Sequence, residues 1–558
     1  MNTRMPIGVE DFKEVREQYY LVDKTKFLKE LIDDHSKVTL ITRPRRFGKT
    51  LTMSMVEYFF SLQKETESRQ LFAGLAIEKA GPAYMAQRGQ YPVIFLSLKE
   101  LKNLTWQDML DNWQVFLRKV YIQYAYVMQH ERIDEAMKDD YQRIMERKAS
   151  VNELANALAR LMEMVYQYYG KKVIVLIDEY DVPVQQAWEN GFYPECIQFV
   201  KQFLGNALKT NEYLDFAILT GVLRIAKESI FSDLNNFDVY SVLSNMYSDA
   251  IGFTSAEVEQ LAKDVGMTDA LPEIKAWYDG YHFGNTEIYN PWSVLNYFKR
   301  KRLDDYWVNT SGNLILQDLL QKRTPEQAKE LLALLEGKAI TTVLYENVAY
   351  QDLSQNQDIL YTMLLTTGYL TVNSAKDVWG GTMCQLAIPN REIRDIYQRE
   401  ILERLRSGMN LSAVYMTMLA LVEGKGQLFA KGLAEYLTQI VSVYDTAHKE
   451  SFYHGLILGL TALVIANYTI ESNCESGYGR FDVALFPKDA QKWGIVLEFK
   501  VAQTIEELPA KADEALRQIQ EKQYTETFNT RGIHRVWQYG IAFCGKEICV
   551  RMNERIGT

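Results

Sequence analysis

The sequence predicts an α/β fold in which helices cover both faces of a parallel sheet. Two observations support this prediction: short apolar runs with the length and β-branched content of buried strands, and stretches of helical periodicity between them. The expected strands are residues 38–42, 91–98, 172–177 and 216–220. Residues 51–60 and a charged region that ends near Tyr169 are expected to be helical. Strands that alternate with helices in this way favour parallel pairing.

The chain of 558 residues is too long for one hydrophobic core, and we expect three domains. The parallel sheet is expected within residues 1–250. Residues 251–400 combine short helices with aromatic-rich connectors and a hairpin of strands at 364–372 and 383–389, which suggests a winged-helix-like region. Residues 401–558 are expected to form a smaller α/β domain. Its expected elements are helices at 450–466 and 513–524 and strands at 480–487, 493–501 and 536–544.

The composition limits the classes of partner. The formal net charge is −10, which argues against a protein that coats polyanions, although local basic patches can still bind nucleic acid. The five cysteines are scattered without zinc-binding spacing, which is typical of a reducing cytoplasm. No apolar signal segment opens the sequence, and the longest apolar run, residues 455–466, is about half a bilayer span. We therefore expect a cytoplasmic protein without a membrane partner.

Residues 43–50, RPRRFGKT, end like the phosphate-binding loop G-x-x-x-x-G-K-[ST] but begin with an arginine in place of the first glycine. Gly48 lets the backbone approach a phosphate, Lys49 would meet the β- and γ-phosphates, and Thr50 would ligate Mg²⁺. Arg43 is acceptable if its position needs no positive φ, and the following proline favours that, because a residue before proline is extended. The loop is completed by Pro44, Arg45, Arg46, Phe47 and Leu51.

A pair of carboxylates strengthens this interpretation. Asp178 and Glu179 end the apolar strand VIVLIDE, where the first could hold the Mg²⁺ shell and the second could polarise the attacking water. Thr220 ends the next strand, in a position to sense the γ-phosphate, and Arg224 follows one helical turn later. Two alternatives remain open: the carboxylates could form an ordinary strand-end turn, and Thr220 and Arg224 could be structural residues.

Five segments together resemble the bacterial AAA-ATPase-like family of P-loop proteins. They are, in order, YYLVDKT, RPRRFGKT, LIDEYDVPV, LTGVLRIAKESIFSDLNN and WYDGYHFG with YNPWS, and they span roughly residues 5–310. An arginine in place of the first glycine is usual in that family, which implies a variant phosphate site rather than a broken one. The resemblance implies ATP binding. It does not imply what ATP turnover would drive.

A second group of charged residues falls in the third expected domain. Asp482 is expected inside one strand, and Glu498 and Lys500 in the next, where a period of two places both on one face. Two carboxylates can hold Mg²⁺, and a nearby lysine can orient or deprotonate a water molecule. The alternative is an edge strand with a solvated Glu-Lys face. The apolar flanks on both faces argue against it, because charges among buried residues need partners.

The spacing D…E-x-K resembles the PD-(D/E)xK nuclease superfamily, and the segments FYHGLILGL, SNCESGYGRFDVAL and VLEFKV are similar to the nuclease domain that follows this ATPase family. The third domain is then expected to be restriction-endonuclease-like. The resemblance implies that Glu450 is a further metal-site carboxylate. It also implies that Gln518 and Tyr524 help to position the phosphate. Arg480, in the turn that enters the strand, could contact a phosphate or form a structural salt bridge. Phe481 stands where the proline of the superfamily's name would be.

We therefore expect an ATP-binding and ATP-hydrolysing protein joined to a nuclease that uses Mg²⁺, or Mn²⁺, to cleave DNA, in defence against foreign DNA. RNA is a second substrate class that no motif excludes, and a homo-oligomer is an open alternative. The competing hypothesis is a nucleotide-dependent signalling or scaffold protein whose last domain binds nucleic acid without cutting it. The presence of all three residues Asp482, Glu498 and Lys500 favours the enzyme.

Overall fold

The computed structural model describes the chain as two compact units, Met1–Arg394 and Asp395–Thr558. The described residues are 3–224, 237–307, 330, 333–335, 337–345, 359–379, 381–397, 411–440, 450–461, 464, 467–472, 475–476, 479–489 and 491–556. The first unit contains both the region expected as a sheet domain and the middle region. Each unit is described by itself below.

The core of the first unit is a five-stranded sheet in the order β2-β3-β4-β1-β5, in which every pairing is parallel. Its strands are β1 (Val38–Thr42), β2 (Val93–Ser97), β3 (Val173–Asp178), β4 (Leu214–Gly221) and β5 (Phe237–Tyr240). The four predicted strands are confirmed. The fifth was missed because its FDVY sequence is half-exposed at the sheet edge and lacks a buried apolar run.

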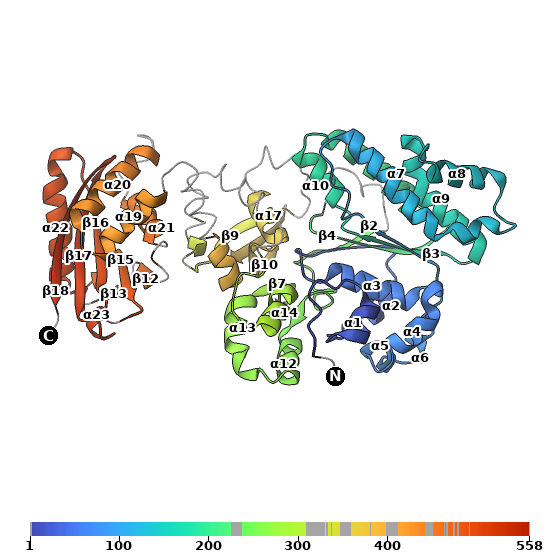
Figure 1. Cartoon of the computed structure of the whole chain (residues 1–558), viewed down its shortest axis with the longest axis horizontal. Coiled ribbons are helices and arrows are strands. Elements are labelled where there is room, and N and C mark those ends of the chain that lie inside the picture. The colour runs from blue at the N-terminus through green and yellow to red at the C-terminus, as the bar shows by residue number, and fades with distance from the viewer. Residues whose placement is uncertain are drawn as a thin grey trace. The chain divides into compact units, whose positions relative to one another are not determined.

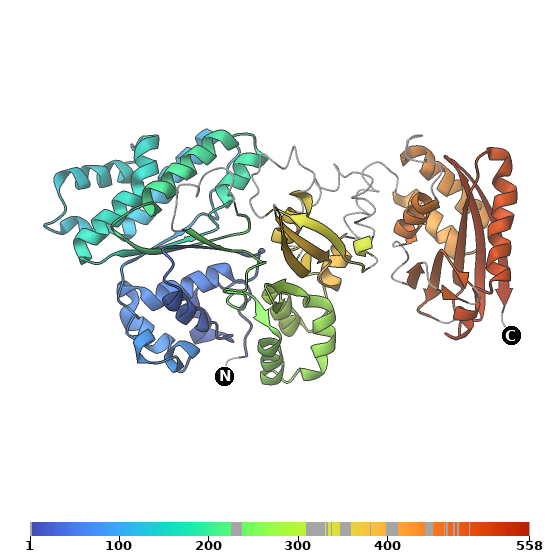
Figure 2. The same ribbon diagram turned by 180° about the vertical axis from the view of Figure 1, so that it is seen from behind.

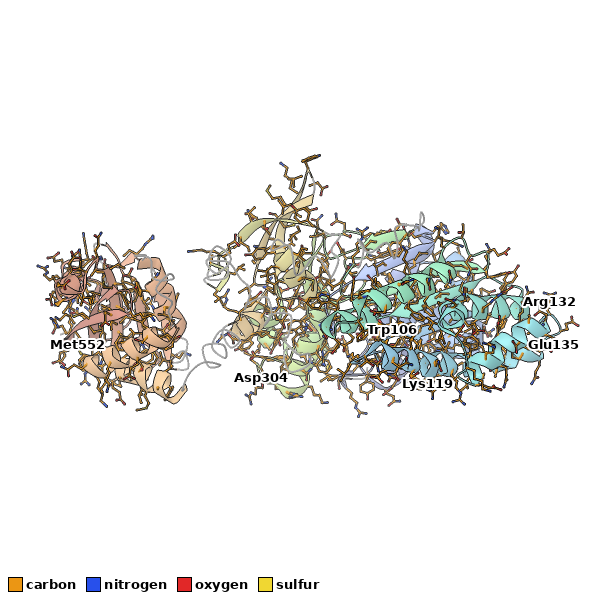
Figure 3. The ribbon with its side chains drawn as sticks, turned by 90° about the horizontal axis from the view of Figure 1, so that it is seen from above. Trp106, Lys119, Arg132, Glu135, Asp304 and Met552 are labelled. Atoms are coloured by element: carbon orange, nitrogen blue, oxygen red, sulfur yellow. The ribbon has the colours of Figure 1, made fainter. Side chains whose placement is uncertain are left out.

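Helices cover both faces of this sheet, as predicted (Figure 1). One face carries α1 (Phe12–Gln18), α2 (Lys26–Asp34), α3 (Lys49–Phe60), α4 (Glu65–Leu71), α5 (Ala76–Lys79) and α6 (Pro82–Met85). The other carries α7 (Trp106–Gln123), α8 (Glu135–Met145), α9 (Val151–Tyr169), α10 (Val182–Glu189) and α11 (Tyr193–Leu208). A reciprocal capping box between Ser150 and Glu153 starts α9, where the sequence SVNE has the required spacing. Figure 3 shows Arg132 and Glu135 at the outer tip of the second helical layer.

The middle region contributes two small antiparallel sheets to the same unit. The sheet β6-β8-β7 is made of Phe253–Thr254, Thr286–Tyr289 and Tyr281–Phe283, beside α12 (Ser255–Asp264), α13 (Leu271–Tyr278) and α14 (Pro291–Arg300). The sheet β10-β11-β9 is made of Thr371–Val378, Gly381–Ala387 and Ile340–Leu344, and α17 (Ile359–Thr367) lies between β9 and β10 in the chain. The predicted hairpin exists, but its first strand begins at Thr371, not at residue 364. The run ILYTMLLTT forms a buried helix, because length and apolarity alone do not separate a short buried helix from a strand.

The second unit is a mixed sheet in the order β12-β15-β16-β17-β18, in which only β16 and β17 pair in parallel. Its strands are β12 (Tyr468–Ser472), β15 (Val483–Pro487), β16 (Gly494–Val501), β17 (Arg535–Cys544) and β18 (Glu547–Ile556), with a separate pair β13 (Glu475–Ser476) and β14 (Gly479–Arg480). One face packs on α19 (Leu411–Val422), α20 (Gly426–Ile440) and α21 (Glu450–Thr461), and the other on α22 (Leu508–Glu521) and α23 (Glu526–Asn529) (Figure 2). The alternation of apolar side chains along β15 and β16 supplies both cores.

Among the helices in the described part of the chain, none combines the length and the apolarity needed to cross a membrane.

Candidate nucleotide and metal-ion sites

The phosphate loop joins β1 to α3 at the carboxyl edge of the parallel sheet, where ligands of open α/β sheets bind. Gly48 is the residue before α3 and has a φ of 100°, a conformation that side chains rarely adopt. Arg46 has a φ of 67°, whereas Arg43 is not among the residues of positive φ. The backbone therefore needs no glycine at position 43, as the sequence predicted from the proline that follows.

The side chain of Arg43 is buried and anchors the loop to neighbouring backbone segments. Its guanidinium is 0% exposed and donates four hydrogen bonds, to the carbonyls of Thr42, Tyr240, Ser241 and Tyr247, at 2.8–3.0 Å. It also lies 4.8 Å from the ring centroid of Phe283. Burial lowers the pKa of this guanidinium to about 9. We expected Arg43 among the nucleotide-binding residues, but the structure gives its side chain to the protein's own carbonyls.

The side chains predicted to meet the nucleotide converge on Asp178. Thr50 Oγ1 donates to Asp178 Oδ2 at 2.6 Å, and Thr220 Oγ1 donates to Asp178 Oδ1 at 2.5 Å. Lys49 Nζ donates to the carbonyls of Arg43 and Pro44 at 3.0 and 2.9 Å. The loop hydroxyl, the strand-end carboxylate and the hydroxyl of β4 thus form one hydrogen-bonded chain across three elements. A hydroxyl and a carboxylate oxygen are suitable Mg²⁺ ligands, so these residues fit the implied ion.

Glu179 follows β3 with a φ of 52°, a left-handed backbone that is uncommon outside glycine. Burial raises its pKa, and the positive charges of Lys49 and Arg45 oppose that shift. Strained backbone at a site edge that carries a carboxylate is typical of functional positions. Glu179 lines the same cavity as Lys49, which makes it a candidate base.

Sequence reasoning missed the two residues that follow Glu179. The hydroxyl of Tyr180 donates to Leu223 O at 2.6 Å, and Asp181 Oδ2 accepts the amides of Val222 and Leu223 at 2.9 Å each. These bonds fix the segment between Thr220 and Arg224 at the end of β4. Their only sequence signal was the position of two more polar residues in DEYD. Arg224 lies at the end of this segment, and the residues after it are outside the described part of the chain.

A cavity of about 450 Å³ lies over the loop. It is walled by the N-terminal segment, the loop, Glu179 and the middle region. The wall residues include Pro6, Val9, Tyr20, Val22, Lys24, Arg45, Lys49, Thr50, Glu179, Phe253, Trp292 and Leu295. Apolar side chains on one side and loop cations on the other suit a nucleotide, whose base is apolar on its faces and whose phosphates are charged.

The motifs YYLVDKT and WYDGYHFG with YNPWS hold these walls together. Tyr20 donates to Asp264 at 2.7 Å, and Lys24 donates to Glu257 at 2.6 Å, so the N-terminal segment is bonded to α12. Phe47 meets Tyr281 edge-on with centroids 5.0 Å apart. The sequence motifs are thus explained by contacts around the cavity, and the middle region shares a core with the loop.

The second unit brings together the other three predicted residues. Asp482 Oδ2 accepts the amide of Phe499 at 2.7 Å, so the carboxylate of one strand is held against the next. Lys500 Nζ lies 3.3 Å from Glu498 Oε1, and both side chains are on the same face of β16. Asp482 was predicted inside a strand, but β15 begins one residue later, at Val483. The side chain of Asp482 accepts a hydrogen bond from the neighbouring strand. Regular strand pairing therefore does not include this residue.

Residues of α22 complete this arrangement. Gln518 Nε2 donates both to Glu498 Oε1 and, at 3.1 Å, to the hydroxyl of Tyr524. Arg480 is exposed in β14, and a Cβ on the adjacent Gly479 would lie 3.1 Å from Tyr524. Glu450 is the first residue of α21, and its side chain lies outside the described residues. His454, one turn later, was not counted as a site residue but lies 3.1 Å from the carbonyl of Asp482 through Nε2.

The carboxylates of this site are in an environment that favours a cation. Glu498 is 2% exposed, and its Oε2 is buried without a hydrogen-bond partner among the described residues. The pKa of Glu498 is raised to about 8, first by burial and then by the charge of Asp482, while Lys500 opposes both. Burial likewise raises the pKa of Asp482. No group of three potential ligand residues occurs in the described part of the chain, so Asp482 and Glu498 are the two carboxylates available as metal ligands. The unpaired oxygen fits a divalent cation.

Replacing Glu498 with glutamine is expected to stabilise the metal-free second unit at high pH. The folded state keeps a proton on Glu498 up to a pKa of about 8, whereas an unfolded glutamate loses it near 4.5. Wild-type stability therefore falls as pH rises from about 4.5 to about 8 and is level above, by on the order of 5 kcal/mol in total at about 1.36 kcal/mol per pKa unit. Glutamine titrates nowhere in this range. Thermal melting in a chelator from pH 5 to 9 measures the difference.

Two controls accompany this measurement. Asp513→Asn replaces an exposed carboxylate of α22 and should leave the pH profile of wild type unchanged. Added Mg²⁺ should raise the stability of wild type at pH 8 more than that of Glu498→Gln, because only the wild type offers the ion both carboxylates. Identical pH profiles for wild type and Glu498→Gln would show that Glu498 is not buried as described.

Family models match two separate parts of the chain. Residues 6–231 match the AAA-ATPase-like family, described as "Predicted AAA-ATPase", and residues 448–553 match the PD-(D/E)XK nuclease superfamily. The chain carries an AAA-ATPase-like domain and a PD-(D/E)XK nuclease superfamily domain. The family resemblance predicted from the motifs is thereby confirmed. The AAA-ATPase-like domain contains the phosphate loop, Asp178, Glu179 and Thr220, and the nuclease superfamily domain contains Asp482, Glu498 and Lys500.

One curated relative is similar to this chain over nearly its whole length. It is the "Uncharacterized protein in vnfD 5'region" of Azotobacter chroococcum mcd 1, 26% identical over 560 residues that cover 95% of this chain and 94% of that one. Among solved structures, the Aeropyrum pernix ORC1 protein in complex with DNA matches at a TM-score of 0.26 and 9% identity, over 69% of this chain and 96% of that chain. A likeness of that size supports no functional conclusion.

Proposed function

We propose that the AAA-ATPase-like domain binds ATP with Mg²⁺ and hydrolyses it. The observation that supports this is the hydrogen-bonded chain from Thr50, which lines the nucleotide-sized cavity, through Asp178 to Thr220. The ion, when bound, would neutralise charge on the phosphates. The N–H groups at the start of α3 would bind phosphate oxygens, and Lys49 would exchange two loop carbonyls for the β- and γ-phosphates. Glu179 would orient the water and accept its proton.

We propose that the nuclease superfamily domain hydrolyses phosphodiesters of DNA. Asp482 and Glu498 would hold Mg²⁺ or Mn²⁺, and the buried unpaired oxygen of Glu498 is the single observation that most supports this. The ion would supply Lewis acidity at the phosphate. Lys500 would orient the attacking water, and Gln518 with Tyr524 would hold Glu498 and the phosphate in register. Arg480 is proposed as an exposed contact to the nucleic acid backbone.

The two activities are proposed to be coupled, so that ATP binding or hydrolysis gates or assembles the nuclease. We propose a cytoplasmic role in defence against foreign DNA as the setting for such a pair. Oligomerisation of the chain would be one means of assembly. A chain that binds nucleotide, and whose last domain binds nucleic acid without cutting it, would instead be a signalling or scaffold protein. The experiment below separates the enzyme hypothesis from this one.

The decisive experiment incubates the purified full chain with plasmid, linear duplex, single-stranded DNA and RNA, in Mg²⁺ or Mn²⁺, with and without ATP. Cleavage that needs a divalent ion and is lost in Asp482→Ala is expected. Binding without cleavage under every condition would favour the scaffold hypothesis, and cleavage of RNA alone would correct the substrate class. Size-exclusion chromatography of the same samples with and without ATP tests assembly.

A further inference from the structure

The phosphate loop contains three arginines, and the structure uses them differently. Arg43 is buried on four carbonyls, so its charge is engaged within the protein. Arg46 lies over the ring of Trp292, 3.9 Å from its centroid, and joins the loop to the start of α14. Arg45 and Arg46 both line the nucleotide cavity together with Lys49, Thr50 and Glu179. Because Arg46 is held against Trp292, Arg45 is the arginine of the loop whose position better suits a ligand.

The surroundings of Arg45 allow its guanidinium to exchange partners. One NH2 group donates to the amide oxygen of Gln185 at 2.9 Å, a neutral acceptor on α10 that also donates to Glu189. The backbone of Arg45 is held separately, because Trp307 Nε1 donates to its carbonyl at 3.1 Å. The side chain can therefore leave a neutral amide for a phosphate without moving the loop. Arginine and phosphate carry opposite charges and frequently pair through two parallel hydrogen bonds, which a single amide oxygen cannot match.

The position of Arg45 also points to one end of the nucleotide. Its charge acts on both Lys49 and Glu179, the two residues proposed to meet the γ-phosphate and the attacking water. Lys49 and Thr50 are the residues proposed to meet the terminal phosphates, and Arg45 lines the same cavity as both of them and Glu179. We propose that Arg45 binds the γ-phosphate and stabilises its charge during transfer, within the same chain. This inference rests on the proposed ATP hydrolysis.

The step is ordinary hydrolysis. The water oxygen forms a bond to the γ-phosphorus, the bond from that phosphorus to the β–γ bridging oxygen breaks, and ADP leaves with the electron pair. The water proton passes to Glu179 and then to solvent. The equatorial oxygens carry the charge that a guanidinium can pair, and an arginine so placed accelerates such reactions by roughly 10³-fold or more. Because the arginine comes from the loop itself, turnover per chain should not depend on the protein concentration.

The test compares Arg45→Ala, Arg45→Lys and Gln185→Ala in the full chain, with ADP, a non-hydrolysable ATP analogue and ATP. Wild type should bind the analogue about tenfold or more tightly than ADP through the γ-phosphate contact, and Arg45→Ala should lose that preference while its ADP affinity stays similar. Its turnover should fall by on the order of 10³-fold, with partial recovery in Arg45→Lys. Gln185→Ala removes the resting partner and should keep the preference for the analogue.

Several outcomes would overturn the inference. Equal loss of ADP and analogue binding in Arg45→Ala would make Arg45 a structural residue, as would a Gln185→Ala variant with the same losses. An unchanged preference in Arg45→Ala would remove Arg45 from the γ-phosphate. Turnover that rises per chain with concentration would indicate an arginine from a second copy. If wild type binds no nucleotide, the proposed ATPase function itself fails, and Arg45 with it.

Discussion

Replacing Asp482 or Lys500 with alanine is expected to reduce nucleic acid cleavage by on the order of a hundredfold or more in each case. Phosphodiester hydrolysis needs a nucleophilic water and stabilisation of charge on the phosphate. Asp482 is held against the next strand by the amide of Phe499, and Lys500 is 3.3 Å from Glu498, so each variant removes a group that lies at the reacting phosphate in the proposed complex. Nucleotide affinity should stay unchanged, because the phosphate loop belongs to the other unit.

The two variants should differ in their affinity for the metal ion. Asp482→Ala should weaken Mg²⁺ or Mn²⁺ binding, since it removes a ligand. Lys500→Ala should leave binding nearly intact or slightly tighter, since a neighbouring positive charge has gone. Calorimetric titration of the ion and a cleavage time course measure the two effects, with the exposed Asp513→Ala as a matched control. Full cleavage by Asp482→Ala would exclude the proposed site.

Replacing Lys49 with alanine should abolish detectable ATP binding, whereas Glu179→Gln should retain binding and lose turnover. Lys49 is buried against the loop, and burial is the main cause that lowers its pKa, so its charge is held in a low-dielectric site where a phosphate is the favourable partner. Glutamine keeps the shape of Glu179 but cannot accept the proton of water. The structure therefore predicts separate defects, one in binding and one in chemistry.

Calorimetry and phosphate release distinguish these defects. Lys29→Ala, which removes an exposed lysine paired with Asp33 on α2, serves as a control for the loss of a positive charge. Equal ATP affinity in wild type and Lys49→Ala would remove the phosphate loop from the proposal. Turnover by Glu179→Gln at the wild-type rate would assign the base elsewhere.

The sequence predicted the parallel sheet and the residues around Asp178 because local signals coincided there: a buried apolar run, a glycine where the backbone turns, and carboxylates at a strand end. It also predicted that Asp482 and Glu498 lie near each other, since neighbouring strands and a period of two suffice for that. It did not predict the bracing of Val222 and Leu223 by Asp181, which joins residues 41 and 42 positions apart. It also missed the helix at Ile359–Thr367, because burial on all sides removes the amphipathic pattern.

The environment of Glu498 also could not be predicted from the sequence. An E-x-K pattern places two charges on one face of a strand, but the burial of one oxygen without a partner depends on how α22 covers that face. The same holds for the differing roles of the three loop arginines, whose partners are Tyr247, Trp292 and Gln185 in distant segments. Pair contacts of that kind are set by tertiary packing.

The guanidinium of Arg43 has a consequence for how this loop can change over evolutionary time. Arg43→Gly would recreate the familiar glycine pattern, yet it would remove four hydrogen bonds to carbonyls, of which those of Ser241 and Tyr247 also accept backbone amides, at about 1–3 kcal/mol for each carbonyl left without a donor. The familiar motif is therefore the disfavoured one in this chain. A reversion would be tolerated only alongside compensating changes near residues 240–247. Descendants of such a chain would keep the arginine through any single mutational step, and a search that demands glycine there would overlook them.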